Sequence, residues 1–221
     1  VMLLSPEMSQ EEAESRIDTL ICGMYGINID VNDLIRGIRL NDKQRNVLNE
    51  MSKRGDWVTI CSDGDRPMTL GEIPRYVRQY NPDLVLVDGM TLIGTKSEAG
   101  WSQANDLSQG LKNIAASLSV SILVCQWANQ KAGDGTTPPK LSHVYMGDSL
   151  AQASDRIVSL FQPKGEIGLR VSIQKFRKGR PKVKALKFKF DPSHGLIYEL
   201  KPEDNLSENV EDVVEEIEAI P

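Results

Sequence analysis

The chain has 221 residues, of which 40% are hydrophobic and 26% charged, a composition typical of a globular protein with one ordinary core. No apolar run approaches the roughly 20 residues of a membrane-spanning helix, and no basic stretch precedes the first apolar residues as in a signal peptide. The net charge of -5 is uneven, because the segment from Glu203 onward carries eight acids and no Lys or Arg. The preceding residues hold 26 basic and 23 acidic side chains, a charge of +3.

Cysteine and histidine are too few and too widely spaced for a histidine-rich metal site or a structural zinc site. Cys22, Cys61 and Cys125 form no CxxC pair, and we interpret them as reduced thiols in or near the core of a cytosolic protein. His143 and His194 are isolated from each other in the sequence. The ligand spacing of a structural zinc site is therefore absent.

The first half of the chain is predicted to begin with a strand and continue with helices. Residues 1–4 are apolar without a preceding turn or cap, which suggests that the sequence starts inside a strand and was cut from a longer chain. Ser9 and Glu12 form a capping box that predicts a helix through about Ile21. Two short helices are expected near Val31–Arg36 and Asp42–Lys53.

Strands and helices are then predicted to alternate. Thr69 and Glu72 form a second capping box, which predicts a helix ending before Asn81. Two unbroken apolar runs predict strands buried on both faces of a parallel sheet. The expected elements are strands at Trp57–Cys61, Leu84–Val87 and Val120–Cys125, a helix at Ala104–Leu118, and a long loop at Ala128–Ser142.

The pattern changes after Ala151 to successive short strands. These are expected at Arg156–Phe161, Leu169–Phe176, Val183–Phe190 and Leu196–Leu200, with a bulge near Leu186 where the alternation slips by one residue. The sequence predicts an α/β fold with a mainly parallel sheet flanked by helices and an antiparallel C-terminal extension. We expect one domain over residues 1–201 and a disordered or marginally helical acidic tail over residues 202–221.

Three polar residues follow the predicted parallel strands, at the edge where such sheets bind ligands. They are Glu7, Asp88 and Gln126. A nucleoside triphosphatase needs a carboxylate to orient or deprotonate water, another to hold Mg²⁺ through its water shell, and a neutral polar group to sense the terminal phosphate. Alone, an Asp that closes a buried strand is more often a turn residue, so the prediction depends on all three.

A basic block follows in the antiparallel part. Eleven Lys and Arg residues against three acids lie between Lys164 and Lys201. Such a block suggests a polyanionic partner, although a solvated basic face is an equally good interpretation of the charge alone.

Five segments together carry a family resemblance: Leu4–Ser9, Leu84–Asp88, Val120–Gln126, Ser149–Asp155 and Ile173–Gly179. In this order they resemble the Ser-Leu-Glu-Met-Ser motif, Walker B strand, glutamine sensor strand, Gln-x-x-Asp segment and Lys-x-Arg-x-Gly hairpin of the ATPase domain of DnaB-type replicative DNA helicases. The resemblance covers the chain to about Leu200 and implies a RecA-like fold. Departures from the family pattern at Pro6, Gly89 and His143–Tyr145 suggest a divergent, phage-type member.

The resemblance assigns ATP as the substrate and a role to each site residue. Glu7 is implied to be the catalytic base, Asp88 to support Mg²⁺, and Gln126 to couple the terminal phosphate to the following loop. Lys175 and Arg177 are implied to act in trans on the nucleotide of a neighbouring subunit, as an arginine finger does; otherwise they belong to a plain basic strand.

The implied partners are single-stranded DNA, other copies in a hexamer, and a helicase loader or primase in the cytoplasm of a bacterial or phage-infected cell. DNA contacts are expected from the loops Gly94–Gln103 and Ala128–Ser142, through Lys96, Lys131 and Lys140. Solvated loops are nearly as good an interpretation of these lysines.

The phosphate-binding motif Gly-x-x-x-x-Gly-Lys-Ser/Thr does not occur in the sequence. We therefore expect little or no ATPase activity from this chain alone. Two alternatives remain open: a non-catalytic RecA-like module that joins a helicase or loader, and a recombinase or clock-type ATPase relative.

Overall fold

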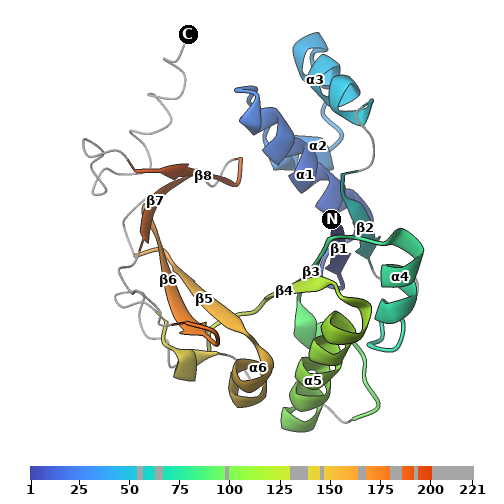
Figure 1. The fold of residues 1–221 in the computed structure, drawn as a ribbon. Helices are drawn as coiled ribbons and strands as arrows, with labels where there is room; N and C mark the ends of the chain where they lie inside the picture. Colours follow the sequence, from blue (N-terminus) through green and yellow to red (C-terminus); the bar gives the residue numbers. More distant parts are fainter. Residues whose placement is uncertain are drawn as a thin grey trace.

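The computed structural model describes residues 1–53, 57–62, 67–97, 100–129, 139–144, 147–163, 168–179, 186–191 and 194–200. Their strands form two four-stranded sheets, one parallel and one antiparallel (Figure 1). The predicted α/β class with an antiparallel extension is therefore confirmed. No described helix is long and apolar enough to cross a membrane.

The parallel sheet holds the first half of the chain together. Its strands are β1 (Met2–Ser5), β2 (Thr59–Ser62), β3 (Leu84–Asp88) and β4 (Ser121–Cys125), in the spatial order β2-β1-β3-β4. All three pairings are parallel, so the four strands end at the same edge of the sheet.

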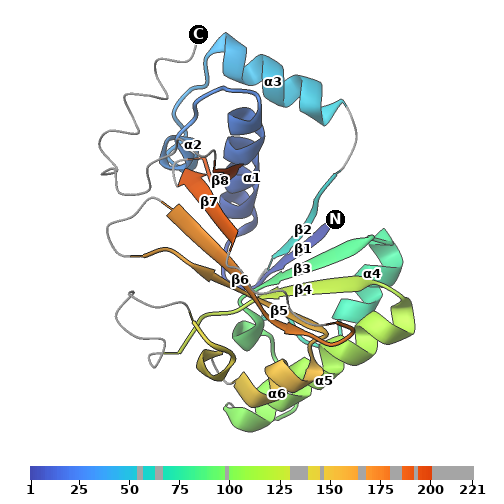
Figure 2. The same cartoon turned by 60° about the vertical axis from the view of Figure 1, so that its left-hand side comes forward.

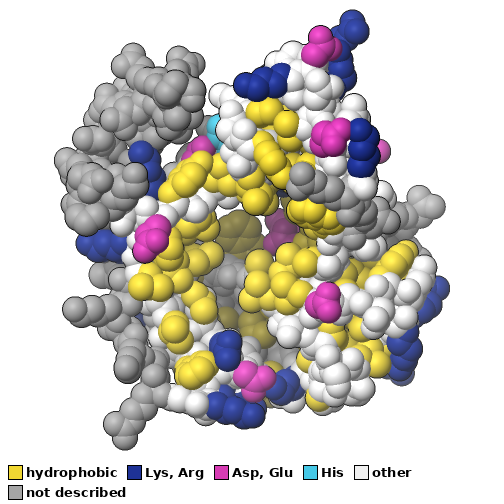
Figure 3. All heavy atoms as spheres, turned by 45° about the horizontal axis from the view of Figure 1, so that its top comes forward, with side chains coloured by type: hydrophobic (Ala, Val, Ile, Leu, Met, Phe, Trp, Pro, Cys, Tyr) yellow, Lys and Arg dark blue, Asp and Glu magenta, His cyan; other side chains and the backbone are white. Residues whose placement is uncertain are grey.

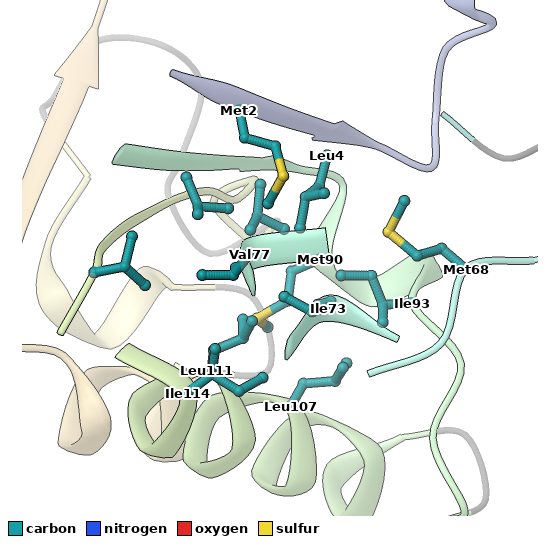
Figure 4. Packing of buried hydrophobic residues seen from close by; sticks show 13 residues of the cluster. Met2, Leu4, Met68, Ile73, Val77, Met90, Ile93, Leu107, Leu111 and Ile114 are labelled. Carbon is teal, nitrogen blue, oxygen red and sulfur yellow. The ribbon is translucent and has the colours of Figure 1, made fainter. Parts of the chain in front are cut away.

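One face of this sheet packs on α4 (Ile73–Tyr80) and α5 (Trp101–Leu118) (Figure 2). The side chains of Met2 and Leu4 point from β1 toward the helices, and those of Leu107 and Leu111 come from α5 (Figure 4). These residues are at most 4% exposed. The main hydrophobic core therefore lies between the sheet and these two helices.

The other face of the parallel sheet is less covered than predicted. In β3, Val85 and Val87 are buried while Leu86 is only half-buried, and in β4 Leu123 is 54% exposed. The prediction of strands buried on both faces is wrong for the described residues, because their helices α4 and α5 cover one face. In Figure 3, hydrophobic side chains (yellow) surround a hollow on the side of the molecule shown.

A second, smaller core lies among α1 (Gln10–Met24), α2 (Val31–Ile35) and α3 (Asp42–Ser52). Its buried members are Cys22, Ile27 and Ile29. The predicted cap of α1 is confirmed, since the Ser9 hydroxyl accepts a hydrogen bond from the Glu12 N–H at 3.1 Å. The helix continues to Met24, beyond its predicted end at about Ile21.

Thr69 does not cap a helix, and α4 begins only at Ile73. The N-cap of α4 is Glu72, three residues after Thr69, and Thr69 lies before it in a bridge to Gly94. Its N–H and hydroxyl donate to the Glu72 carboxylate at 3.0 and 2.7 Å, which closes a turn ahead of the helix. The second capping box is therefore wrong as a helix start, and Pro74 takes the early-turn position that proline tolerates.

The antiparallel sheet consists of β5 (Arg156–Phe161), β6 (Gly168–Phe176), β7 (Leu186–Asp191) and β8 (Leu196–Glu199), in that spatial order. A register shift lies between Ile157 and Val158, whereas the slip predicted near Leu186 borders residues 180–185, outside the described residues. On one face of this sheet, aliphatic side chains remain exposed and are not covered by the described elements. These exposed residues are Val158, Leu160, Ile173, Leu186 and Ile197.

Replacement of Asp18 by Asn is expected to stabilise the protein at neutral pH. Burial on α1, and then the charge of Glu14, raise the pKa of the Asp18 carboxyl above its ordinary value of 3.8. The ionised form is thus disfavoured in the folded state, and wild-type stability falls as pH rises through this pKa. Chemical unfolding of Asp18→Asn should show a gain at pH 7 that shrinks toward pH 4. Glu14→Gln should give a smaller gain in the same direction, and a pH-independent effect of Asp18→Asn would contradict this origin.

Candidate functional site

Three predicted site residues lie at the carboxyl edge of the parallel sheet. Glu7 follows β1 by two residues, Asp88 is the last residue of β3, and Gln126 comes directly after β4. Because β3 pairs with both β1 and β4, these strand ends are neighbours. The structure therefore brings together the three residues that the sequence placed at one edge.

The side chain of Glu7 lies against Gly89, the residue after Asp88. A Cβ atom built on Gly89 would be 3.2 Å from Oε2 of Glu7 and 3.3 Å from its Cβ, closer than most Cβ contacts. Gly89 also has φ of +79°, a left-handed conformation that favours glycine. This glycine lets the Glu7 carboxylate approach the end of β3. In the sequence, the only indication of this role is that the residue after Asp88 departs from the family pattern.

The side-chain amide of Gln126 has no partner among the described residues. Both Oε1 and Nε2 are shielded from solvent, yet neither makes a hydrogen bond there. A shielded amide without partners carries a desolvation cost of roughly 1–3 kcal/mol, which natural proteins rarely leave uncompensated. The amide is therefore unsatisfied in this conformation, and its side chain must turn out of the shielded position to contact a ligand at the sheet edge.

Cys125 is adjacent to this site and remains a thiol at neutral pH. Partial desolvation raises the pKa of Cys125, and the carboxylate of Asp88, its register partner on β3, raises it further. Only one of the three cysteines is buried, since Cys22 is buried, Cys61 is half-buried and Cys125 is exposed overall. The prediction that all lie in or near the core is thus too broad.

Carboxylate clusters able to hold a metal ion by themselves do not occur in the described part of the chain. Mg²⁺ that is bound with a nucleotide keeps most of its water and is commonly held by one or two carboxylates plus phosphate oxygens. Asp88 is half-buried at the end of β3, next to the Gly89 that Glu7 lies against, and is a suitable single ligand or water acceptor.

Lys175 and Arg177 lie elsewhere, at the end of β6 and against the C-terminal turn of α6 (Gly147–Ala153). The ammonium group of Lys175 donates to the carbonyl of Ala151 at 2.6 Å, and Arg177 donates to the carbonyl of Gln152 at 2.7 Å. No contact seen between described residues joins either cation to Glu7, Asp88 or Gln126. The structure thus separates the hairpin cations from the carboxylate edge of the same chain.

Asp155 and Lys112 belong to this second group and were given no role from the sequence. Asp155 forms ion pairs with Arg177, at 3.3 Å, and with Lys112 of α5. Asp155 was visible as the end of the Gln-x-x-Asp segment, but Lys112 is 43 residues away and only the fold brings it there.

The lysines expected to contact DNA are only partly described. Lys96 and Lys140 are both exposed, whereas Lys131 lies outside the described residues. Lys140 precedes the short helix η3 (Leu141–His143), and a bridge between Ala128 and Val144 closes the base of the long loop. The two described lysines are thus accessible to a polyanion.

Comparisons with known proteins place the chain in a family. Two solved structures share its fold. One is an ATPase domain (TM-score 0.75, 19% identity, 90% of this chain and 74% of that chain covered). The other is a DnaB-like replicative helicase, described with its interactions with primase (TM-score 0.74, 19% identity, 90% and 51% covered), so the chain spans about half the length of that protein. No curated protein matches the sequence. The sequence profile of the DnaB-like helicase C terminal domain matches residues 1–194, and the chain therefore belongs to the DnaB-like helicase C-terminal domain family.

Proposed function

We propose that the chain is part of an ATP-driven replicative DNA helicase, a motor that translocates on single-stranded DNA within a hexameric ring. The observation that carries this proposal is the meeting of Glu7, Asp88 and Gln126 at the carboxyl edge of one parallel sheet, in a chain that belongs to the DnaB-like helicase C-terminal domain family. Two carboxylates and a neutral amide at adjacent strand ends are the groups that a nucleoside triphosphatase needs to position water, hold Mg²⁺ and contact the terminal phosphate.

Each residue at the carboxyl edge has a defined task in this proposal. Glu7 accepts a hydrogen bond from the attacking water and takes its proton, Asp88 holds the water shell of Mg²⁺, and Gln126 donates from Nε2 to the terminal phosphate. When bound, Mg²⁺ neutralises charge that develops on the phosphate oxygens.

Lys175 and Arg177 act on the nucleotide of a neighbouring subunit. Their separation from Glu7 and Asp88 of the same chain supports this assignment, because cations that complete a site from the next subunit need not contact their own carboxylate edge. A guanidinium suits the task, since it stays charged and can bind two phosphate oxygens at once.

The remaining partners follow from the family and from charge. Exposed Lys96 and Lys140, together with Lys131, bind the phosphates of single-stranded DNA in a salt-dependent, sequence-independent way. A helicase loader or primase is a further partner, since one structural relative is described with its interactions with primase. The protein acts in the cytoplasm of a bacterial or phage-infected cell.

A second candidate is a non-catalytic RecA-like module that joins a helicase or its loader. It is favoured by one observation, the lack of a Gly-x-x-x-x-Gly-Lys-Ser/Thr motif within the 221 residues. Backbone amides and a lysine that grip the β and γ phosphates are therefore not supplied by such a motif here.

Titration with Mg·ATP separates the two candidates. Trp127 is 71% exposed and directly follows Gln126, so its fluorescence reports on that strand end once Trp57 and Trp101 are replaced by Phe. We expect Mg·ATP to change this emission, and Gln126→Leu to weaken binding by roughly tenfold, the value of one hydrogen bond to a charged group. Glu7→Gln should preserve binding, because it removes charge but keeps the shape of the side chain.

The matched control is Gln103→Leu, which removes an amide on α5 that already donates to the backbone carbonyls of Thr91 and Ile93. No emission change up to millimolar ATP would favour the non-catalytic module. Turnover by the chain alone is expected to be negligible, and Mg-dependent turnover that Glu7→Gln abolishes would contradict that expectation.

A further inference from the structure

Three cations surround the carboxylate of Asp155 where α5, α6 and the end of β6 meet. Asp155 forms ion pairs with Lys112 and with Arg177, and the charge of Lys175 acts on it as well. The backbone N–H of Arg177 also donates to the carbonyl of Asp155 at 2.9 Å. The backbone contact thus fixes Asp155 beside the cations independently of its side chain.

The cations have anchors of their own. Lys175 and Arg177 donate to the carbonyls of Ala151 and Gln152, at the negative end of α6. These contacts do not involve the Asp155 carboxylate. The two cations are therefore expected to stay in place if that carboxylate turns away.

The Asp155 carboxylate is also easily replaced. Its side chain is 57% exposed and that of Arg177 is 47% exposed, so solvent and ions reach both. Ion pairs at such exposed positions contribute little to stability, because water and salt screen them. The hydrogen bond and charge of Lys112, followed by the charges of Arg177 and Lys175, lower the pKa of Asp155 and keep it ionised at neutral pH.

We propose that Lys112, Lys175 and Arg177 form a binding site for a terminal phosphate. In the absence of a ligand, the Asp155 carboxylate occupies this phosphate site as an internal counter-ion, and a polyphosphate displaces it. The proposal rests on the proposed function, in which the arriving phosphate belongs to the nucleotide of a neighbouring subunit. It adds Lys112 to the cations that receive that phosphate and gives Asp155 the role of a competitor.

The charges favour the exchange. A carboxylate brings one negative charge and two oxygens, whereas a terminal phosphate brings about two charges and three oxygens. Three cations around one carboxylate leave an excess of two positive charges, which a phosphate neutralises more fully. The Asp155 carboxylate thereby competes with anions that bind the three cations only weakly. A polyphosphate that is placed correctly at the site still displaces it.

The affinity of the chain for inorganic tripolyphosphate tests the phosphate site directly. Calorimetric titration at low ionic strength should show binding to the full chain, and Asp155→Asn should tighten it by about tenfold, because the competing charge is gone. The matched control is Asp148→Asn, which removes the same charge from an exposed position in the first turn of α6 and should tighten binding at most about twofold. Lys112→Gln should weaken it.

Equal affinities for Asp155→Asn and Asp148→Asn would overturn the proposal. Should Asp155→Asn loosen the fold, the NMR signal of the Arg177 Nε–H group in the wild-type chain gives a second measurement. It should shift as tripolyphosphate is added and shift less in Lys112→Gln, and an unchanged signal at saturation would also overturn the proposal.

The outcome is separable from that of the proposed function. If Asp155→Asn tightens polyphosphate binding but loss of Arg177 leaves turnover in a ring unchanged, the phosphate site is supported and the proposed action of Arg177 on a neighbouring subunit is contradicted. If loss of Arg177 abolishes turnover but Asp155 has no effect on polyphosphate affinity, only the counter-ion proposal fails.

Discussion

Arg177→Ala is expected to lower ATP turnover by about 10³-fold in a ring that hydrolyses ATP, with nucleotide affinity nearly unchanged. The guanidinium stabilises charge that spreads over the phosphate oxygens in the transition state, so its loss affects the chemical step more than ground-state binding. Single-turnover rates and nucleotide affinities of the same variant measure the two effects separately. Lys178→Ala removes the next cation of the hairpin and should reduce turnover far less.

Mixing two inactive variants tests whether Arg177 acts in trans. Glu7→Gln subunits keep the cation, and Arg177→Ala subunits keep the base. If the two groups come from different subunits, random mixed rings contain some intact interfaces, about a quarter of them at equal proportions, and activity returns. Mixed rings that remain as inactive as either parent would contradict a contribution from the neighbouring subunit.

Much of the fold was predictable because its signals are local. Apolar runs set the strands β3 and β4, and capping at Ser9 set the start of α1. The placement of Asp88 and Gln126 at one edge followed from a general rule, because parallel strands joined by helices must end on the same side.

The errors arose where tertiary contacts decide. Thr69 and Glu72 satisfy the spacing of a capping box, but Glu72 itself is the N-cap, and its carboxylate accepts from Thr69 in a turn ahead of the helix. Leu123 belongs to an apolar run, yet whether a run is buried on both faces depends on what covers the sheet, which periodicity does not contain.

The contacts that matter most for the candidate sites were the least predictable. The approach of Glu7 to Gly89 joins the residues after two different strands, and the ion pair between Lys112 and Asp155 joins residues 43 positions apart. Neither has a local sequence signal, because each depends on how separate elements pack. The sequence indicates which kinds of side chain are present, whereas only the folded structure shows which of them contact each other.

Leu107→Ala is expected to destabilise the protein by about 2–5 kcal/mol, a large part of the roughly 5–15 kcal/mol typical of a domain. Leu107 is fully buried between α5 and the parallel sheet, so truncation removes apolar contacts and leaves a cavity that neighbouring side chains fill only partly (Figure 4). Denaturant unfolding should show a lower midpoint at an unchanged slope.

The same substitution at Leu123 is the matched control, because this leucine lies on β4 of the same sheet but is 54% exposed. Leu123→Ala should cost less than about 1 kcal/mol, since most of its apolar surface already contacts water and little cavity forms. If the two variants lost equal stability, the main core would not lie on the α4–α5 side of the sheet. A loss confined to Leu107→Ala supports a core on that side, with the Glu7, Asp88 and Gln126 strand ends set on a sheet that this core holds rigid.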